Sequence, residues 1–192
     1  MMNYYDTHAQ QYFDKTAHAD MKELYDMVLP DLPKSARILD LGCGSGRDAA
    51  FFKAQGYDVF AIEPSEGLAC LAMENFGIEV WPYKMQEIKF EAEFDLIWAC
   101  ASLIHLKSDE MPDMWKRLKR SLKPGGRIFA TFKKGDFEGL REGRWYCDYT
   151  MPKLEKSGFK EAGLELILLS ESKDKLPGRE DLIWKNIVLG IE

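Results

Sequence analysis

Cysteine and histidine are scarce in this sequence of 192 residues, which contains four of the first and three of the second. The cysteines lie 27 or more residues apart and form no CxxC pair, a spacing typical of neither a zinc site nor a disulfide scaffold. Apolar runs stay well short of the roughly 20 residues of a membrane span. The first residues show no basic stretch followed by an apolar one, so we expect no signal peptide. These features predict a cytoplasmic protein with no membrane partner and no metal.

Basic residues are also in the minority, with 26 Lys and Arg against 32 Asp and Glu and a net charge of −6. An acidic surface does not attract a phosphate backbone, so bulk nucleic acid is not an expected partner. A hydrophobic content of 46% with 30% charged residues is ordinary for a folded globular protein. The length fits one domain spanning residues 1–192.

Short apolar runs alternate with helix-like segments along most of the chain. The runs are nearly continuous in apolar residues, as expected for parallel strands that are covered on both faces. Helices are predicted over 46–55 and over 109–123, where apolar residues recur on one face. The Lys-Pro-Gly-Gly segment at 123–126 predicts a turn before the next strand. The predicted strands are 37–41, 57–62, 94–99 and 127–132, with a weaker pattern at 77–81.

The last third of the chain differs from the rest. Residues 133–149 are rich in glycine and charge and are predicted to form a long loop, and Thr150 is the expected N-cap of a short helix. Two further strands are predicted at 163–171 and 182–190, and their connection is too short for a helical crossover, so they should form an antiparallel hairpin. The sequence therefore predicts a three-layer α/β fold: a doubly wound, mostly parallel seven-stranded sheet with an antiparallel C-terminal strand.

Three glycines at alternate positions follow the first predicted strand and lead directly into a helix. Glycine permits a tight turn and close approach of a ligand to the backbone, while the helix N-terminus offers free N–H groups. Residues 44–49 fit the dinucleotide pattern G-x-G-x-x-A, and residues 40–46 fit D-x-G-x-G-x-G. Because Asp40 would repel a pyrophosphate and attract an ammonium or sulfonium group, the charge favours S-adenosylmethionine over NAD.

The sequence resembles the class I S-adenosylmethionine-dependent methyltransferases, in particular small single-domain bacterial ones. Residues 38–46 match the family's cofactor motif, Glu63 its ribose-binding acid, 94–98 its fourth strand and 122–126 the turn before its fifth. Lys84 departs from the pattern, because the family commonly has an acid there for the adenine amino group, so Met85 and Gln86 are the alternative adenine contacts. The resemblance implies S-adenosyl-L-methionine as cofactor and the following cofactor-binding residues: Tyr12, Asp40, Gly42, Cys43, Gly44, Gly46, Arg47, Glu63, Pro64, Ser65, Met85, Gln86 and Cys100.

The methyl acceptor is harder to read from the sequence. In-line methyl transfer depends mainly on alignment, and a general base is needed only if the nucleophile arrives protonated. His105, just beyond the fourth strand, is the candidate catalytic base, although it could instead cap the next helix or pack under the loop. Residues 1–30 are predicted to be a helical lid, with Tyr12 beside the methionine part of the cofactor. Residues 133–149 are predicted to be the substrate-side loop, on which Arg144, Trp145 and Tyr149 suit an anionic or planar substrate.

The leading interpretation is transfer of a methyl group to an O, N, S or chalcogen nucleophile of a small molecule. Residues 100–103, Cys-Ala-Ser-Leu, replace the Asn/Asp-Pro-Pro-Tyr/Phe of enzymes that methylate exocyclic base amines or glutamine amides. A tRNA-modifying methyltransferase, a non-catalytic S-adenosylmethionine-binding module and an NAD-dependent enzyme stay open as alternatives. The chain could act as a monomer or a homodimer.

Overall fold

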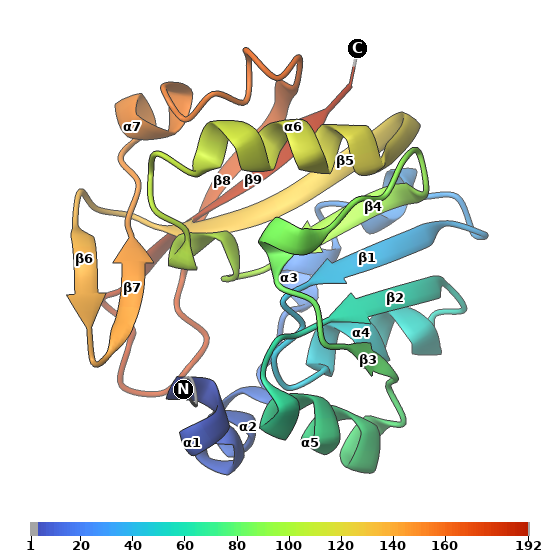
Figure 1. Cartoon of the computed structure of the whole chain (residues 1–192), viewed down its shortest axis with the longest axis vertical. Coiled ribbons are helices and arrows are strands. Elements are labelled where there is room, and N and C mark those ends of the chain that lie inside the picture. Colours follow the sequence, from blue (N-terminus) through green and yellow to red (C-terminus); the bar gives the residue numbers. More distant parts are fainter. Residues whose placement is uncertain (1–3, 192) are drawn as a thin grey trace. The chain divides into compact units, whose positions relative to one another are not determined.

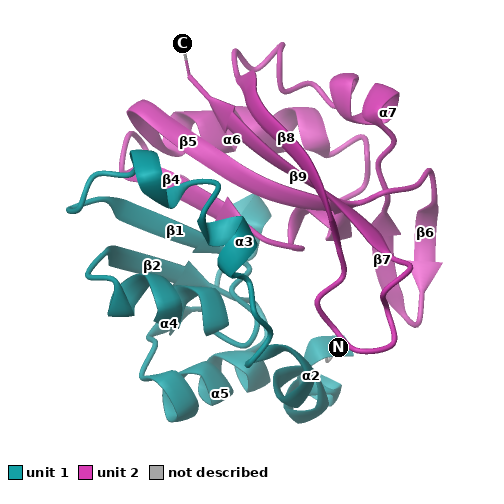
Figure 2. Cartoon of the chain, turned by 180° about the vertical axis from the view of Figure 1, so that it is seen from behind, with its two compact units in different colours: residues 1–88 teal, residues 89–192 magenta. Residues whose placement is uncertain are grey.

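The computed structural model of the chain describes residues 4–191. They fall into two compact units, Met1–Ile88 and Lys89–Glu192, which Figure 2 colours separately. Three strands in the first unit and four in the second make up the seven strands predicted from the sequence, and the mostly parallel α/β class is confirmed. Within residues 4–191, no helix is both long and apolar enough to cross a membrane.

The first unit contains a parallel sheet in the order β3-β2-β1, with helices as the connections between successive strands (Figure 1). β1 is buried along almost its whole length, as the continuous apolar run predicts for a strand covered on both faces. The predicted third strand at 77–81 is shorter in the structure, because Gly77 ends the preceding helix in a left-handed conformation. The elements are β1 (Arg37–Leu41), α4 (Arg47–Ala54), β2 (Asp58–Ile62), α5 (Glu66–Phe76) and β3 (Val80–Trp81).

Short helices precede β1 and pack on α5. A Cβ placed on Gly67 of α5 would lie 2.9 Å from the Cβ of Ala9, so the glycine allows this close approach. The Oγ of Ser65, which caps α5, donates a hydrogen bond to Oδ1 of Asp6 at 2.7 Å. The helices that pack on α5 are α1 (Tyr4–Thr7) and α2 (Ala9–Thr16). They are followed by α3 (Lys22–Tyr25) and the 3-10 turn η1 (Leu29–Asp31), and a second 3-10 turn, η2 (Met85–Glu87), follows β3.

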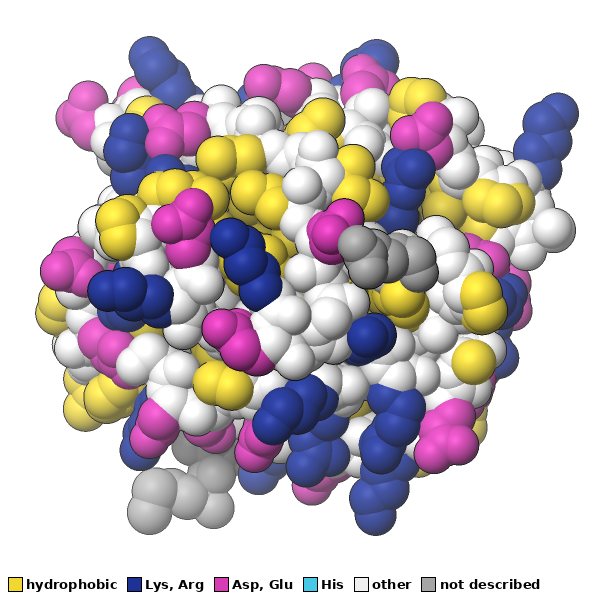
Figure 3. Space-filling view, turned by 90° about the horizontal axis from the view of Figure 1, so that it is seen from above, with side chains coloured by type: hydrophobic (Ala, Val, Ile, Leu, Met, Phe, Trp, Pro, Cys, Tyr) yellow, Lys and Arg dark blue, Asp and Glu magenta, His cyan; other side chains and the backbone are white. Residues whose placement is uncertain are grey.

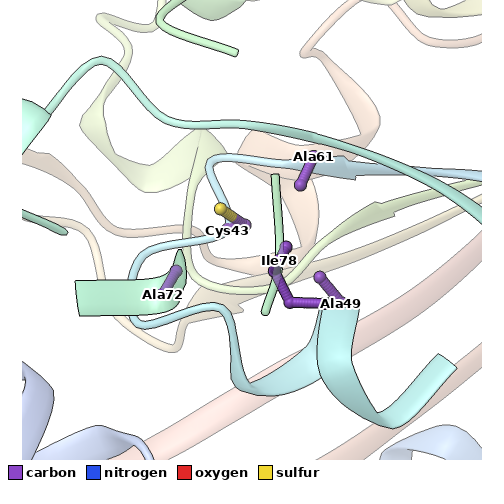
Figure 4. Close-up of a cluster of buried hydrophobic side chains, with 5 residues drawn as sticks. All are labelled: Cys43, Ala49, Ala61, Ala72 and Ile78. Carbon is purple, nitrogen blue, oxygen red and sulfur yellow. The ribbon is translucent and has the colours of Figure 1, made fainter. Parts of the chain in front are cut away.

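Small side chains fill the space beneath the glycine loop. Figure 4 shows this cluster, whose members come from the loop, α4, β2, α5 and the segment before β3. A Cβ on Gly46 would lie only 2.7 Å from the Cβ of Ala72, so nothing larger than glycine fits at that point without movement of α5. The buried members are Cys43, Ala49, Ala61, Ala72 and Ile78.

The second unit contains the strand order β4-β5-β9-β8, in which β4 and β5 are parallel and β9 runs antiparallel to both of its neighbours. The predicted C-terminal hairpin is thus confirmed. Thr150 caps its short helix as predicted, with its Oγ1 accepting from the N–H of Lys153. The elements are β4 (Phe94–Ala99), the 3-10 turn η3 (Leu103–His105), α6 (Met111–Ser121), β5 (Leu122–Lys133), α7 (Met151–Glu155), β8 (Glu165–Lys173) and β9 (Ile183–Gly190).

Two sequence predictions in this unit need correction. β5 begins at Leu122 and not after the turn predicted at 123–126; these residues lie at a break in register, because Phe94 pairs with Leu122 and Leu96 with Arg127. Residues 133–149, expected to be an irregular loop, contain the antiparallel pair β6 (Glu138–Arg141) and β7 (Arg144–Cys147). The reason is the two-residue connection: Glu142 and Gly143 have φ of 50° and 76°, and two consecutive left-handed residues are what a tight hairpin turn requires.

Candidate functional site

The glycine loop leaves β1 and is tied to the end of β2. The N–H groups of Gly42 and Cys43 both donate to the carbonyl oxygen of Ile62 at 2.9 Å. Gly44 and Gly46 have φ of 55° and 78°, in the left-handed region that favours glycine. The loop is therefore a rigid turn of bare backbone that opens directly into α4.

Glu63 is the residue immediately after β2 and bridges the loop to the start of α5. One carboxylate oxygen accepts from the N–H of Gly44 at 3.1 Å, and the other accepts from the N–H of Ser65 at 2.9 Å. Burial raises the pKa of the Glu63 carboxyl, and these two N–H donors act in the opposite direction. Each carboxylate oxygen has a second lone pair, so a carboxylate held in this way can also accept hydrogen bonds from the two hydroxyls of a vicinal diol.

Asp40 lies in β1 and is almost wholly buried. Its Oδ2 has no hydrogen-bond partner among residues 4–191. Burial raises the pKa of Asp40 well above its usual range, and the nearby carboxylate of Asp48 adds to this effect, while the charge of Arg47 opposes it. A buried carboxylate oxygen with no partner is costly, and a cationic ligand group would relieve that cost.

The guanidinium of Arg47 is committed elsewhere. It donates to the two carboxylate oxygens of Asp48 at 2.7 and 2.9 Å and to the carbonyl oxygen of Thr16 at 3.2 Å. Tyr25 donates its hydroxyl to the same carboxylate at 2.6 Å. Arg47 is therefore paired with Asp48 and not with Asp40. Around Asp40, acidic side chains outnumber basic ones, because Asp48 and Glu63 are also near it.

The other predicted cofactor residues occupy different positions. Tyr12 lies against the loop, since a Cβ on Gly44 would be 3.3 Å from its ring. The Cys43 thiol is buried in the small-residue cluster, and burial raises its pKa, so it is a packing group rather than a reactive one. Pro64 is exposed, and Met85 and Gln86 form the 3-10 turn η2 after Lys84. Cys100 belongs to the second unit, directly after β4.

His105 ends the 3-10 turn η3 in the second unit. Its Nδ1 lies 2.8 Å from the carbonyl oxygen of Trp145, and because a carbonyl only accepts, Nδ1 carries the proton. Burial lowers the pKa of His105 to about 4. The imidazole is therefore neutral near pH 7, with the lone pair on Nε2. The alternative that His105 caps the next helix is wrong, because α6 begins only at Met111 with Glu110 as its N-cap.

Two of the three predicted substrate residues, Arg144 and Trp145, lie in β7, and Tyr149 follows that strand. Their side chains have different partners and do not form one cluster. Trp145 meets His105 through its backbone, and Arg144 pairs with Glu142 at 2.9 Å. Tyr149 is buried and packs its ring 4.7 Å from that of Phe132.

Two residues beside His105 were not among the predicted site residues, although Tyr146 belongs to the aromatic and arginine cluster of the 133–149 segment. The ring of Tyr146 lies 4.8 Å from the imidazole, and Nζ of Lys133 lies 4.0 Å from the centre of the same tyrosine ring. Its position in the sequence could have identified Lys133 as a candidate. It is the last residue of β5, and ligands of this fold class bind outside the carboxyl ends of the strands.

Comparison with known proteins gives matches to methyltransferases. The sequence profile of a methyltransferase domain family matches residues 38–126. An uncharacterised methyltransferase of Staphylococcus carnosus is 28% identical over 124 residues, 60% of each chain. The 1,6-didemethyltoxoflavin-N1-methyltransferase of Burkholderia thailandensis, solved with 1,6-didemethyltoxoflavin and S-adenosylhomocysteine, has a TM-score of 0.76 at 23% identity, covering 97% of this chain and 83% of that one. An S-adenosylmethionine-dependent methyltransferase of Methanosarcina mazei has a TM-score of 0.77 at 18% identity, covering 88% and 98%.

These matches confirm the resemblance to class I S-adenosylmethionine-dependent methyltransferases, and the match to the methyltransferase domain family covers residues 38–126. The solved structures agree in fold over nearly the whole chain. The chain spans between 37% and 60% of the length of three curated relatives that it matches.

We predict that Asp40→Asn makes the ligand-free protein more stable. Because the folded-state pKa of Asp40 is raised, its contribution to stability is present at low pH and is lost as pH rises above the ordinary value near 4. The variant should therefore gain stability over the wild type as pH rises, by about 1–2 kcal/mol at neutral pH. Urea unfolding of both proteins from roughly pH 4 to pH 8 measures this difference.

The control is Asp58→Asn, the same substitution of a carboxyl that is exposed at the start of β2, where it contacts Arg37 at 3.3 Å. An Asp40→Asn variant that is as stable as the wild type, or less so, at pH 8 would show that the carboxylate is already compensated.

Proposed function

We propose that this protein transfers the methyl group of S-adenosylmethionine to an O, N, S or chalcogen nucleophile of a small molecule. The observation that carries the proposal is the buried Asp40 oxygen without a partner, next to a glycine loop that Glu63 holds in place. A cationic ligand with a vicinal diol complements both carboxylates. S-adenosylmethionine has these groups, whereas the pyrophosphate of NAD would face an excess of acid.

Each part of the first unit has a role in this proposal. S-adenosylmethionine, when bound, supplies a methyl carbon activated by a positively charged sulfur. Asp40 would hold the ammonium group, and Glu63 would accept from the ribose hydroxyls. The glycine loop lets the ligand lie against the backbone, and Tyr12 would cover it, as expected of a lid residue. Arg47 would act indirectly, by neutralising Asp48 so that Asp40 carries the free negative charge.

His105 is the proposed catalytic residue in the second unit. With a pKa of about 4 it is too weak a base to remove a proton from a resting hydroxyl or amine. A nucleophile becomes more acidic as it gives its electrons to the methyl carbon, so the Nε2 lone pair would take the proton during or after transfer. Arg144 and Trp145 would border the acceptor, and Tyr149 would support it from behind, since its ring is buried.

The small-molecule assignment is favoured over the alternatives. A chain of net charge −6 is a poor ligand for tRNA, and the structurally similar toxoflavin-type methyltransferase acts on a small planar molecule. All four cysteines are free, which supports a reducing compartment such as the cytoplasm. The neutral imidazole of His105 favours an active enzyme over a non-catalytic cofactor-binding module.

The test is a calorimetric titration with S-adenosylhomocysteine, with NAD in a parallel cell. We expect binding of the first in the micromolar range and no heat with the second, and acceptors can then be screened by product mass. Asp40→Asn should weaken binding by about tenfold or more, because it removes a charge-assisted hydrogen bond to the ammonium. No heat with S-adenosylhomocysteine would refute the methyltransferase proposal, and heat with NAD would favour a dehydrogenase.

The proposed role of His105 predicts different effects for two substitutions. His105→Asn can still donate to the carbonyl of Trp145 but loses the Nε2 acceptor, and His105→Ala loses both. Both variants should lower kcat by about 100-fold with the acceptor found by screening, without weakening cofactor binding. The wild-type rate should fall only as pH drops toward about 4, where the imidazole gains its proton. Unchanged kcat in His105→Asn would reduce His105 to a packing role.

A further inference from the structure

Lys133 is a cation without an acceptor for its protons. It ends β5, is partly buried, and among residues 4–191 it has no hydrogen bond or ion pair through its side chain. Its contacts are with aromatic faces, at 4.0 Å to the ring of Tyr146 and 5.8 Å to that of Trp184. Such faces attract a cation but cannot accept its three N–H bonds as oxygen atoms do.

The charges around Lys133 are mostly of its own sign. Arg141, Arg144 and Arg179 all disfavour its protonated form, and together with burial they lower its pKa to about 8. The carboxylate of Asp148 favours the protonated form, but both of its oxygens already accept from Arg141, at 3.0 and 2.6 Å. A positive excess is therefore left at the carboxyl end of β5.

This excess is unusual for the molecule. The chain has a net charge of −6, and on the face shown in Figure 3 basic and acidic side chains are interspersed. The next residue, Lys134, has an acidic partner, since its Nζ lies 2.8 Å from a carboxylate oxygen of Glu171. A partly buried lysine that lies near other cations and has no such partner is costly unless an anion binds to it.

We infer that Lys133, lying against the ring of Tyr146, is the binding group for a carboxylate or other oxyanion on the methyl acceptor. The inference rests on the proposed function and deepens it by naming the acceptor's class: a small anionic molecule. The Tyr146 side chain is almost wholly buried, and its ring lies 4.8 Å from the imidazole of His105, whose lowered pKa leaves it without a competing charge at neutral pH. The guanidinium of Arg144, over the same ring at 5.2 Å, would add to the attraction.

The carboxylate that binds Lys133 could also be that of S-adenosylmethionine. One set of variants distinguishes the carboxylate of the acceptor from that of the cofactor. Lys133→Met removes the charge and keeps the length of the side chain, Lys133→Arg keeps the charge, and Lys134→Met is the matched control on the next residue.

The probe is benzoate, and its control is benzamide, which has the same shape but no charge. Binding of each to the full chain is measured by saturation-transfer NMR. Benzoate should bind the wild type better than benzamide does. Lys133→Met should weaken benzoate binding by about tenfold or more, Lys133→Arg should retain part of it, and Lys134→Met should leave it unchanged. Titration of each variant with S-adenosylhomocysteine checks its folding and the cofactor site, and it should give the wild-type affinity.

Three results would overturn the inference: no benzoate binding to the wild type, equal binding of benzoate and benzamide, or benzoate binding that survives Lys133→Met. Loss of S-adenosylhomocysteine affinity in Lys133→Met, with benzoate unaffected, would assign the lysine to the cofactor's carboxylate instead. If the wild type itself ignores S-adenosylhomocysteine, the proposed methyltransferase function fails, and the anion site is judged on the benzoate results alone.

Discussion

A buried carboxylate whose charge is not balanced from within the protein dominates the first unit. Asp40 is held in β1 with one oxygen unpaired, and the nearest base, Arg47, is fully occupied by Asp48 and the backbone of Thr16. The arrangement costs stability in the free protein, and it is the basis of the proposed site for a cation. A stabilising partner such as a second arginine would remove that site, so the cost and the proposed function have the same origin.

Close packing fixes the loop above this carboxylate. The small cluster beneath it lets α5 approach so nearly that Gly46 cannot carry a Cβ, and Glu63 ties Gly44 to the cap of α5. Because the small side chains pack against the loop and the Glu63 carboxylate accepts from its backbone, the loop is held in one conformation. Preorganisation of this kind lowers the entropic cost of binding a ligand.

Sequence patterns predicted much of this, because the decisive signals are local. Continuous apolar runs located β1 and β4 to the residue, and the strand–glycine–helix order located the loop. The hairpin at 138–147 was missed because its strands are short and charged and its turn depends on two left-handed residues, one of them Glu142. Lys133 was missed because its lack of an acceptor is a property of the packed structure: no pattern in the chain shows that Asp148 is already taken by Arg141.

The proposed binding groups of the two units thus have opposite charge: the carboxylate of Asp40 near the end of β1 and the ammonium of Lys133 at the end of β5. The central claim is that Asp40 receives a cation when the cofactor binds. Calorimetric titration with S-adenosylhomocysteine over roughly pH 4 to pH 8, in buffers of different ionisation enthalpy, measures the protons exchanged on binding. Because the pKa of Asp40 is raised in the free protein, the account predicts proton release by the wild type and less release by Asp40→Asn. The same proton count in both proteins, or none in the wild type, would contradict it.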